Sequence, residues 1–211
     1  MSRWGLVLAP GASAGRDQPG LVAIDKAASA AGAAVRRIDF PYRLAGRRAP
    51  DRPEVLVSTV VKEAGSLAQE AGIAPERIFA GGRSMGGRIC SMAVAAGMPA
   101  AGLVLVSYPL HPPGRTDRLR TEHFGSLKVP CLFVSGTSDA YAAPAQLEAA
   151  LATIPGQVTV RWLDGGDHGL RRRDDEAAEV VAAWLATQPT TTSRTGSEAP
   201  EVQGAPAPKE R

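Results

Sequence analysis

Six short runs rich in valine, isoleucine and leucine alternate along this chain with longer segments of helical pattern. The runs are almost continuously apolar, which is typical of strands covered on both faces, whereas a strand with one wet face alternates apolar and polar residues. This alternation predicts an α/β fold: a three-layer α/β/α sandwich with about six mostly parallel strands. The expected strands are Gly5–Ala9, Ala34–Phe40, Arg77–Ala80, Leu103–Ser107, Cys131–Ser135 and Val158–Leu163.

The segments between these runs begin and end at residues that suit helix termini. Pro53 and Pro144 suit first-turn positions, and Asp174 is a candidate N-cap. Three glycines suit the C-terminal ends of helices, namely Gly32, Gly72 and Gly97. The expected helices are Gly20–Ala31, Pro53–Ala71, Met85–Ala96, roughly Thr116–Leu127, Pro144–Thr153 and Asp174–Thr187.

One domain accounts for most of the chain. Its 211 residues suit a single core of ordinary size, and 44% hydrophobic residues with 21% charged residues exclude wholesale disorder. From Gln188 onward the sequence changes to proline, threonine, serine, glutamate and glycine, a composition that cannot bury a core. We therefore expect an α/β domain over residues 1–187 and a disordered tail over residues 188–211.

The charge balance and the cysteines exclude several classes of protein. Lysine and arginine number 24 against 21 acidic residues, a net charge of +3 that does not indicate a nucleic-acid partner. Cys90 and Cys131 lie within apolar stretches, which argues against a disulfide scaffold or a zinc site. Pro10 and Gly11 end the first apolar run before it reaches the length of a signal-peptide core. We expect a cytoplasmic protein with no metal, cofactor or membrane partner, and the sequence leaves its oligomeric state open.

Ser84 lies in a G-x-S-x-G motif at the end of the third expected strand. A helical pattern begins directly after it, at Met85. A serine raised on a sharp turn needs residues without bulk two positions before and after it, and Gly82 and Gly86 meet that need. Ligands of parallel α/β sheets bind beyond the carboxyl ends of the strands. The motif therefore predicts Ser84 as a nucleophile.

A second G-x-S-x-G match surrounds Ser13, after the first expected strand. The residues that follow it, 15–19, have a loop composition that delays any helix. Only one of the two serines can occupy a strand-to-helix turn, and the immediate helix favours Ser84. Ser13 is the alternative.

A serine nucleophile needs a base that takes its proton and a carboxylate that orients this base. Of the three histidines, His168 follows the last strand, His111 follows the fourth, and His123 falls in a polar segment of helical pattern. We expect His168 to be the base. Asp139 comes directly after the fifth strand and is the expected acid. Asp167 is the alternative, but a residue adjacent to His168 in sequence would point elsewhere in most loop geometries.

A serine, an acid and a histidine in this chain order, each after a strand, resemble the α/β-hydrolase superfamily. The resemblance covers roughly residues 4–187 and implies a minimal α/β-hydrolase fold that begins at the family's third strand. Residues 81–86 and 108–113 resemble more specifically a small lidless branch that includes the testis-expressed thirty protein. Dienelactone hydrolases are more distant relatives. They carry cysteine at the position of Ser84, which argues against a dienelactone substrate.

The resemblance also implies an oxyanion hole, formed by backbone N–H groups. Met85 would supply one donor and Ala12 the second, with Gly11 and Ser13 as alternatives. The segment between the fourth and fifth strands is too short for a cap domain, so the site should be open and suited to small soluble esters or thioesters.

Three further residues are candidates for substrate binding. His111 and Tyr141 would line the mouth of the site, or would only satisfy the polarity of their loops. Arg83 could attract an anionic group, although an ion pair with a nearby carboxylate is the favoured interpretation. Together these features predict a serine hydrolase of the carboxylesterase or thioesterase type that forms an acyl-enzyme. The alternative is a catalytically weak protein of the same fold that binds or scaffolds.

Overall fold

A computed structural model describes residues 4–189 and contains one six-stranded sheet. All strand pairs are parallel, and the order is β2-β1-β3-β4-β5-β6. The chain leaves β1 toward one edge and then returns to build the rest of the sheet on the other side, which is a switch point of the kind where α/β sheets bind ligands. The strands are β1 Gly5–Ala9, β2 Ala34–Arg37, β3 Ile78–Arg83, β4 Gly102–Val106, β5 Cys131–Gly136 and β6 Val158–Leu163.

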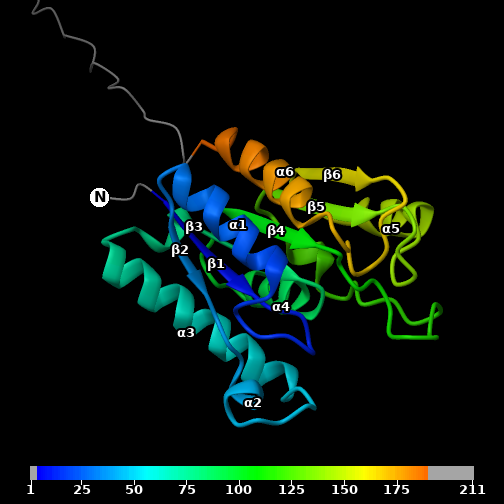
Figure 1. Ribbon diagram of the computed structural model, residues 1–211, viewed down its shortest axis with the longest axis horizontal. Coiled ribbons are helices and arrows are strands. Elements are labelled where there is room, and N and C mark those ends of the chain that lie inside the picture. Colours follow the sequence, from blue (N-terminus) through cyan, green and yellow to red (C-terminus); the bar gives the residue numbers. More distant parts are fainter. Residues whose placement is uncertain (1–3, 190–211) are drawn as a thin grey trace, which may run out of the picture.

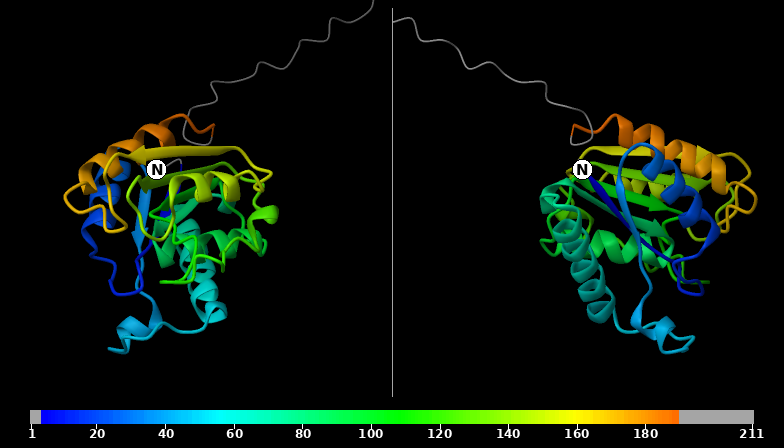
Figure 2. Two further views of the ribbon diagram at one scale, coloured as in Figure 1. Left: turned by 90° about the vertical axis from the view of Figure 1, so that its right-hand side faces the viewer. Right: turned by 60° about the vertical axis from the view of Figure 1, so that its left-hand side comes forward.

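Helices cover both faces of this sheet, which confirms the predicted three-layer sandwich (Figures 1 and 2). One face carries α1 (Pro19–Ala30) and α6 (Asp174–Ala186), and these two helices contact each other. The opposite face carries α3 (Pro53–Ala71), α4 (Met85–Ala95) and α5 (Pro144–Leu151). The short helix α2 (Pro41–Leu44) belongs to a segment that protrudes from the body in both views of Figure 2.

The core is divided by the sheet into two apolar layers. Successive side chains of a strand point to opposite faces, so Leu6 and Leu8 of β1 pack with α1 and α6, whereas Val7 and Ala9 pack with α3 and α4. All five residues of β1 are buried. This explains the continuously apolar runs of the sequence, because both faces of each central strand need apolar side chains.

Several predicted boundaries differ from the structure by one to three residues. β3 runs on through Gly81 and Gly82 to Arg83. Both glycines pair with β1 and β4 despite their turn-like composition, and Arg83 pairs with β4. β2 ends at Arg37, three residues early. Asp174 is the first residue of α6, and Arg173 occupies the N-cap position.

The helix expected at Thr116–Leu127 is wrong. This segment is irregular and contains only a 3₁₀ turn at Phe124–Ser126. Tertiary contacts fix this segment, and not the hydrogen bonds of a helix. The Tyr108 hydroxyl donates to the Arg120 carbonyl (2.6 Å), and Phe124 is fully buried.

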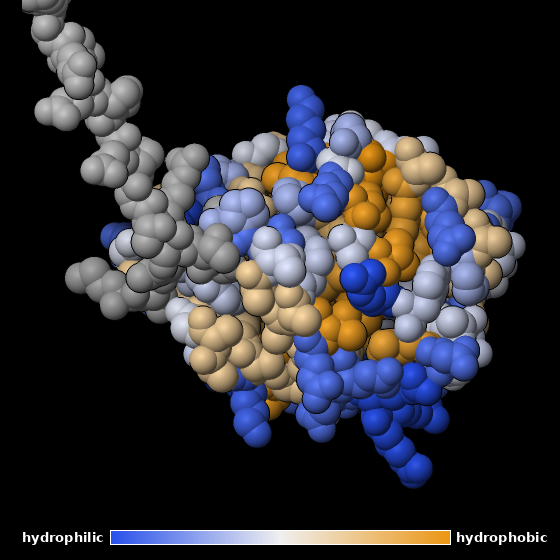
Figure 3. All heavy atoms as spheres, turned by 90° about the horizontal axis from the view of Figure 1, so that it is seen from above, coloured by the Kyte–Doolittle hydropathy of each residue, from blue (hydrophilic) through white to orange (hydrophobic). Residues whose placement is uncertain are grey.

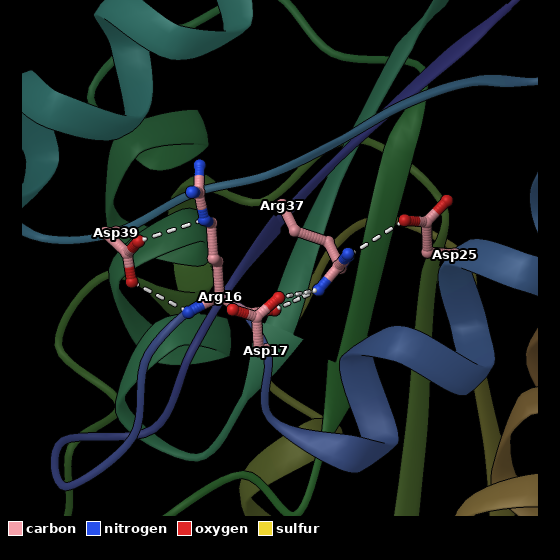
Figure 4. A network of polar contacts seen from close by, with 5 residues as sticks. All are labelled: Arg16, Asp17, Asp25, Arg37 and Asp39. Atoms are coloured by element: carbon pink, nitrogen blue, oxygen red, sulfur yellow. Dashed lines mark hydrogen bonds and ion pairs between the residues drawn. The ribbon is translucent and has the colours of Figure 1, made fainter.

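A network of ion pairs fixes the loop between β1 and α1 (Figure 4). Arg16 contacts Asp39 through its backbone N–H (2.8 Å) and its guanidinium (3.4 Å). Arg37 reaches both Asp17 and Asp25 at 2.8 Å, and these carboxylates raise the pKa of the Arg37 guanidinium. The loop that carries Gly11, Ala12 and Ser13 is therefore tied to the end of β2.

The described surface combines apolar and charged areas. Seen from above, apolar side chains gather in the middle of one face, with charged side chains around them (Figure 3). No helix in residues 4–189 is long and apolar enough to cross a membrane. The tail predicted to be disordered lies, from residue 190 onward, outside the described residues.

Candidate active site

Ser84 occupies a one-residue turn between the last residue of β3 and the first residue of α4. Its backbone has φ 52° and ψ −120°, a conformation that non-glycine residues rarely adopt. A Cβ on Gly82 or Gly86 would lie 2.0 or 2.1 Å from the carbonyl oxygen of Ala9, so no larger residue fits at either position. The spacing of the motif thus follows from the close approach of β1 to this turn.

The structure brings Ser84, His168 and Asp139 into one chain of hydrogen bonds. Ser84 Oγ lies 2.9 Å from His168 Nε2, and His168 Nδ1 lies 2.9 and 3.0 Å from the two carboxylate oxygens of Asp139. An ionised carboxylate only accepts hydrogen bonds, so Nδ1 carries the proton and Nε2 accepts from the serine hydroxyl. Ser84 directly follows β3, and Asp139 and His168 lie in the loops after β5 and β6, which are the places that the sequence predicts.

Burial differs along this chain of hydrogen bonds. The Asp139 side chain has no exposed surface, whereas 24% of the His168 side chain is exposed. The backbone N–H of Tyr141 donates to Asp139 Oδ1 at 2.8 Å and fixes the carboxylate. The Tyr141 ring packs on the His168 ring with centroids 4.3 Å apart. His111 is 3% exposed and stacks behind Tyr141, so it does not line the mouth of the site.

The rival residues of the sequence have different surroundings. Ser13 is exposed at the edge of the same cleft, and no histidine hydrogen-bonds to it within residues 4–189. Asp167 is half exposed and lies 3.9 Å from Arg171. The geometry therefore favours Ser84 over Ser13 and Asp139 over Asp167.

The backbone donors expected for an oxyanion hole also face the cleft. Met85 is the first residue of α4, so its N–H has no acceptor within the helix. The Gly11 N–H already donates to the Gln18 side chain (3.0 Å), which leaves Ala12 and Ser13 as second donors. The Tyr42 hydroxyl donates to the Ala12 carbonyl (2.6 Å) and so holds this peptide segment in place.

The Arg83 side chain is held by an ion pair. Its guanidinium lies 3.4 Å from Asp174 at the start of α6. Burial lowers the pKa of Arg83, and the Asp174 carboxylate opposes that shift. This ion pair supports the structural interpretation of Arg83 over contact with an anionic substrate.

A cleft of about 680 Å³ opens over Ser84. Its walls come from the loop after β1, the segment that follows α2, the start of α4 and the loops after β4, β5 and β6. Arg88 and Arg120, which the sequence analysis did not single out, also line it. No group of three or more histidine, cysteine, aspartate or glutamate side chains in the described range could hold a metal ion.

The fold and this site define an α/β protein with a serine, a histidine and an aspartate joined beyond the strand ends. Residues 2–191 match the family model of the alpha/beta hydrolase domain, and the chain belongs to that family. The protein is therefore a hydrolase. The narrower resemblance to the branch of the testis-expressed thirty protein stays a prediction.

Solved structures share the fold at low sequence identity. An alpha-beta serine hydrolase homologue from Coxiella burnetii has a TM-score of 0.73 at 18% identity, over 88% of this chain and 86% of that one. Est1E from Butyrivibrio proteoclasticus has a TM-score of 0.73 at 13% identity, over 89% of each chain. Dienelactone hydrolase from Anabaena variabilis has a TM-score of 0.66 at 20% identity, over 88% and 85%.

Proposed function

We propose that this protein is a serine hydrolase that cleaves small soluble carboxylic esters or thioesters through an acyl-enzyme. The observation that carries the proposal is the unbroken chain of hydrogen bonds from Ser84 through His168 to Asp139, at the floor of a cleft. The serine hydrolase homologue and Est1E share the fold, which is compatible with this chemistry.

In the first half of the reaction, Ser84 Oγ attacks the ester carbonyl carbon while its proton passes to His168 Nε2. Asp139 holds the ring and stabilises the imidazolium that forms. The carbonyl oxygen becomes an oxyanion, which the N–H groups of Met85 and Ala12 would stabilise. The bond to the alcohol or thiol then breaks, and the leaving group takes the proton from His168.

In the second half, water replaces the alcohol. His168 takes a proton from the water, the resulting hydroxide attacks the acyl carbon, and the bond to Ser84 Oγ breaks with return of the proton to the serine. The open cleft lets small substrates in without the movement of a lid, which favours short acyl chains.

Hydrolysis of 4-nitrophenyl acetate and butyrate tests this proposal. We expect turnover by the wild type and a fall in kcat/KM of at least about 10³-fold in Ser84→Ala. Ser13→Ala is the matched control, because Ser13 sits in the second G-x-S-x-G match on the same cleft, and it should lose only a few-fold. Equal rates for the wild type and Ser84→Ala would favour the alternative of a catalytically weak binding protein.

A further inference from the structure

The charged side chains of the cleft differ in whether a counter-ion neutralises them. Arg88 and Arg120 have no ion pair within the described part of the chain, although both are half-buried. The other charged side chains that line the cleft, apart from His168, form ion pairs. These are Arg83 with Asp174 (3.4 Å), Arg171 with Asp167 (3.9 Å), and Asp51 with Arg47 (2.7 Å). The cleft is therefore lined by two arginines that form no ion pair within residues 4–189, although the nearby Glu122 carboxylate partly offsets the charge around Arg120.

Both arginines are carried by fixed backbone. Arg88 lies one helical turn after Ser84 on α4, and its N–H donates to the Ser84 carbonyl (3.1 Å). Arg120 belongs to the irregular segment between β4 and β5. Its N–H donates to the Leu110 carbonyl (2.8 Å), and its carbonyl accepts from the Tyr108 hydroxyl (2.6 Å). The backbone of each arginine is thus fixed, and both residues line the same cleft as Ser84.

The two guanidinium groups are incompletely solvated and repel each other. Arg88 Nε is buried and has no hydrogen-bond partner among residues 4–189. Burial lowers the pKa of Arg120, and the positive charge of Arg88 lowers it further. A buried charge without a partner is costly, and so is an unpaired buried donor. An anion with two or more oxygens between the guanidinium groups would relieve both costs, because guanidinium binds such groups through paired N–H donors.

We propose that Arg88 and Arg120 form an anion subsite that holds a carboxylate of the ester substrate beside Ser84. This inference rests on the proposed hydrolase function and narrows it to esters that carry a negative charge. Such a charge can sit on the acyl part or on the alcohol part of the ester, and both parts would lie in the cleft that Arg88 and Arg120 line.

Matched pairs of esters test the subsite. For the acyl part, mono-4-nitrophenyl glutarate is compared with 4-nitrophenyl valerate, which has the same acyl length without the charge. For the alcohol part, 4-acetoxybenzoate is compared with phenyl acetate. We expect at least one anionic ester to have a kcat/KM about 10-fold or more above its neutral partner, and Arg88→Gln or Arg120→Gln to remove that preference.

The ratio of the two rates in each pair controls for folding, since any unfolded fraction cancels from it. Arg118→Gln is the matched control: it removes one charge from the exposed surface of the same segment and should leave the ratio unchanged. Arg88→Lys keeps the charge but loses the paired donors, so it should restore only part of the preference. A ratio near one for both pairs in the wild type, or a ratio unchanged by both glutamine variants, would overturn the subsite.

Glutarate binding to the Ser84→Ala variant separates this inference from the proposed function. Calorimetry should detect binding that weakens about 10-fold or more when Arg88→Gln is added. Binding of this kind without ester hydrolysis by the wild type would support the subsite and contradict the hydrolase. Hydrolysis of neutral esters without glutarate binding would support the hydrolase and contradict the subsite. Absence of both hydrolysis and glutarate binding would overturn the two proposals together.

Discussion

Helix α4 and the turn before it carry two serines that each hydrogen-bond a histidine, yet the two pairs have opposite surroundings. Ser84 Oγ lies 2.9 Å from His168 Nε2, and Ser91 Oγ lies 2.7 Å from His123 Nε2. Distance alone does not distinguish them. A serine–histidine contact is a candidate for catalysis only when two further conditions hold. The histidine must have a carboxylate on its other ring nitrogen, and the serine must face a cleft that a substrate can enter.

Behind the two rings the charges have opposite sign. His168 faces the Asp139 carboxylate, which accepts the hydrogen bond of Nδ1–H. The pKa of His123 is lowered to about 4, mainly by burial and then by the positive charge of Arg88, against a weaker opposing effect of Glu122. His123 therefore stays neutral near pH 7, whereas a catalytic base has to accept a proton during the reaction.

In front of the serines the backbone differs as well. Ser84 sits in a strained turn with φ 52° and faces the cleft. Ser91 lies within α4, is fully buried, and donates its hydroxyl proton to the Arg88 carbonyl (2.8 Å). His123 Nε2–H must then donate to Ser91, which fastens the irregular segment after β4 to the helix. We infer that this second pair is structural.

The carboxylate behind His168 should have the largest effect on activity. Asp139→Asn keeps the shape of the side chain but lets it donate to Nδ1, which imposes the wrong tautomer on His168 and should lower kcat about 10⁴-fold. Asp167→Asn, one position before the histidine, is the matched control and should change kcat by only a few-fold. Steady-state ester hydrolysis measures both. Equal losses in the two variants would contradict the role of Asp139.

The second pair should affect stability and leave activity nearly unchanged. Ser91→Ala leaves the His123 N–H without its acceptor in a buried site, so the free energy of unfolding should fall by about 1–3 kcal/mol. Ser58→Ala, on the exposed surface of α3, should change it by no more than about 0.5 kcal/mol. Urea unfolding measures the difference. A loss of activity from Ser91→Ala beyond the unfolded fraction would mean that the second pair takes part in the reaction.

The low pKa of His123 predicts a modest dependence of stability on pH. An unfolded histidine binds a proton near pH 6.5, whereas folded His123 does so only near pH 4. The unfolded state therefore binds more protons in this range, and stability falls as the pH drops from 6.5 toward 4. His123→Gln removes this contribution and should give a shallower decline of Tm over that range. Identical slopes for both proteins would show that another group carries the effect.

Much of the fold and part of the site could be predicted because their signals are local. Continuous apolar runs indicate buried parallel strands, and Gly82 and Gly86 mark the close approach of β1 to the turn at Ser84. The positions of Asp139 and His168 follow from parallel topology, since residues after neighbouring strands meet at one edge of the sheet.

The rest depends on tertiary contacts that leave no local pattern. The segment around Arg120 has no helix, because Tyr108, Phe124 and His123 anchor it separately. Nothing in the sequence near Arg120 indicates that it reaches the cleft. The sequence does carry a signal for Arg88 as a residue of the cleft, because Arg88 is the only charged residue in the apolar helix α4 and lies one turn after Ser84.

Labelling with a fluorophosphonate probe, followed by peptide mass mapping, tests the difference between the two serines most directly. The probe bonds to a serine that has both a base and an oxyanion site. We expect one adduct, on Ser84, that is lost in His168→Ala and kept in His123→Gln. An adduct on Ser91 or Ser13, or the absence of any adduct from the folded protein, would contradict the account.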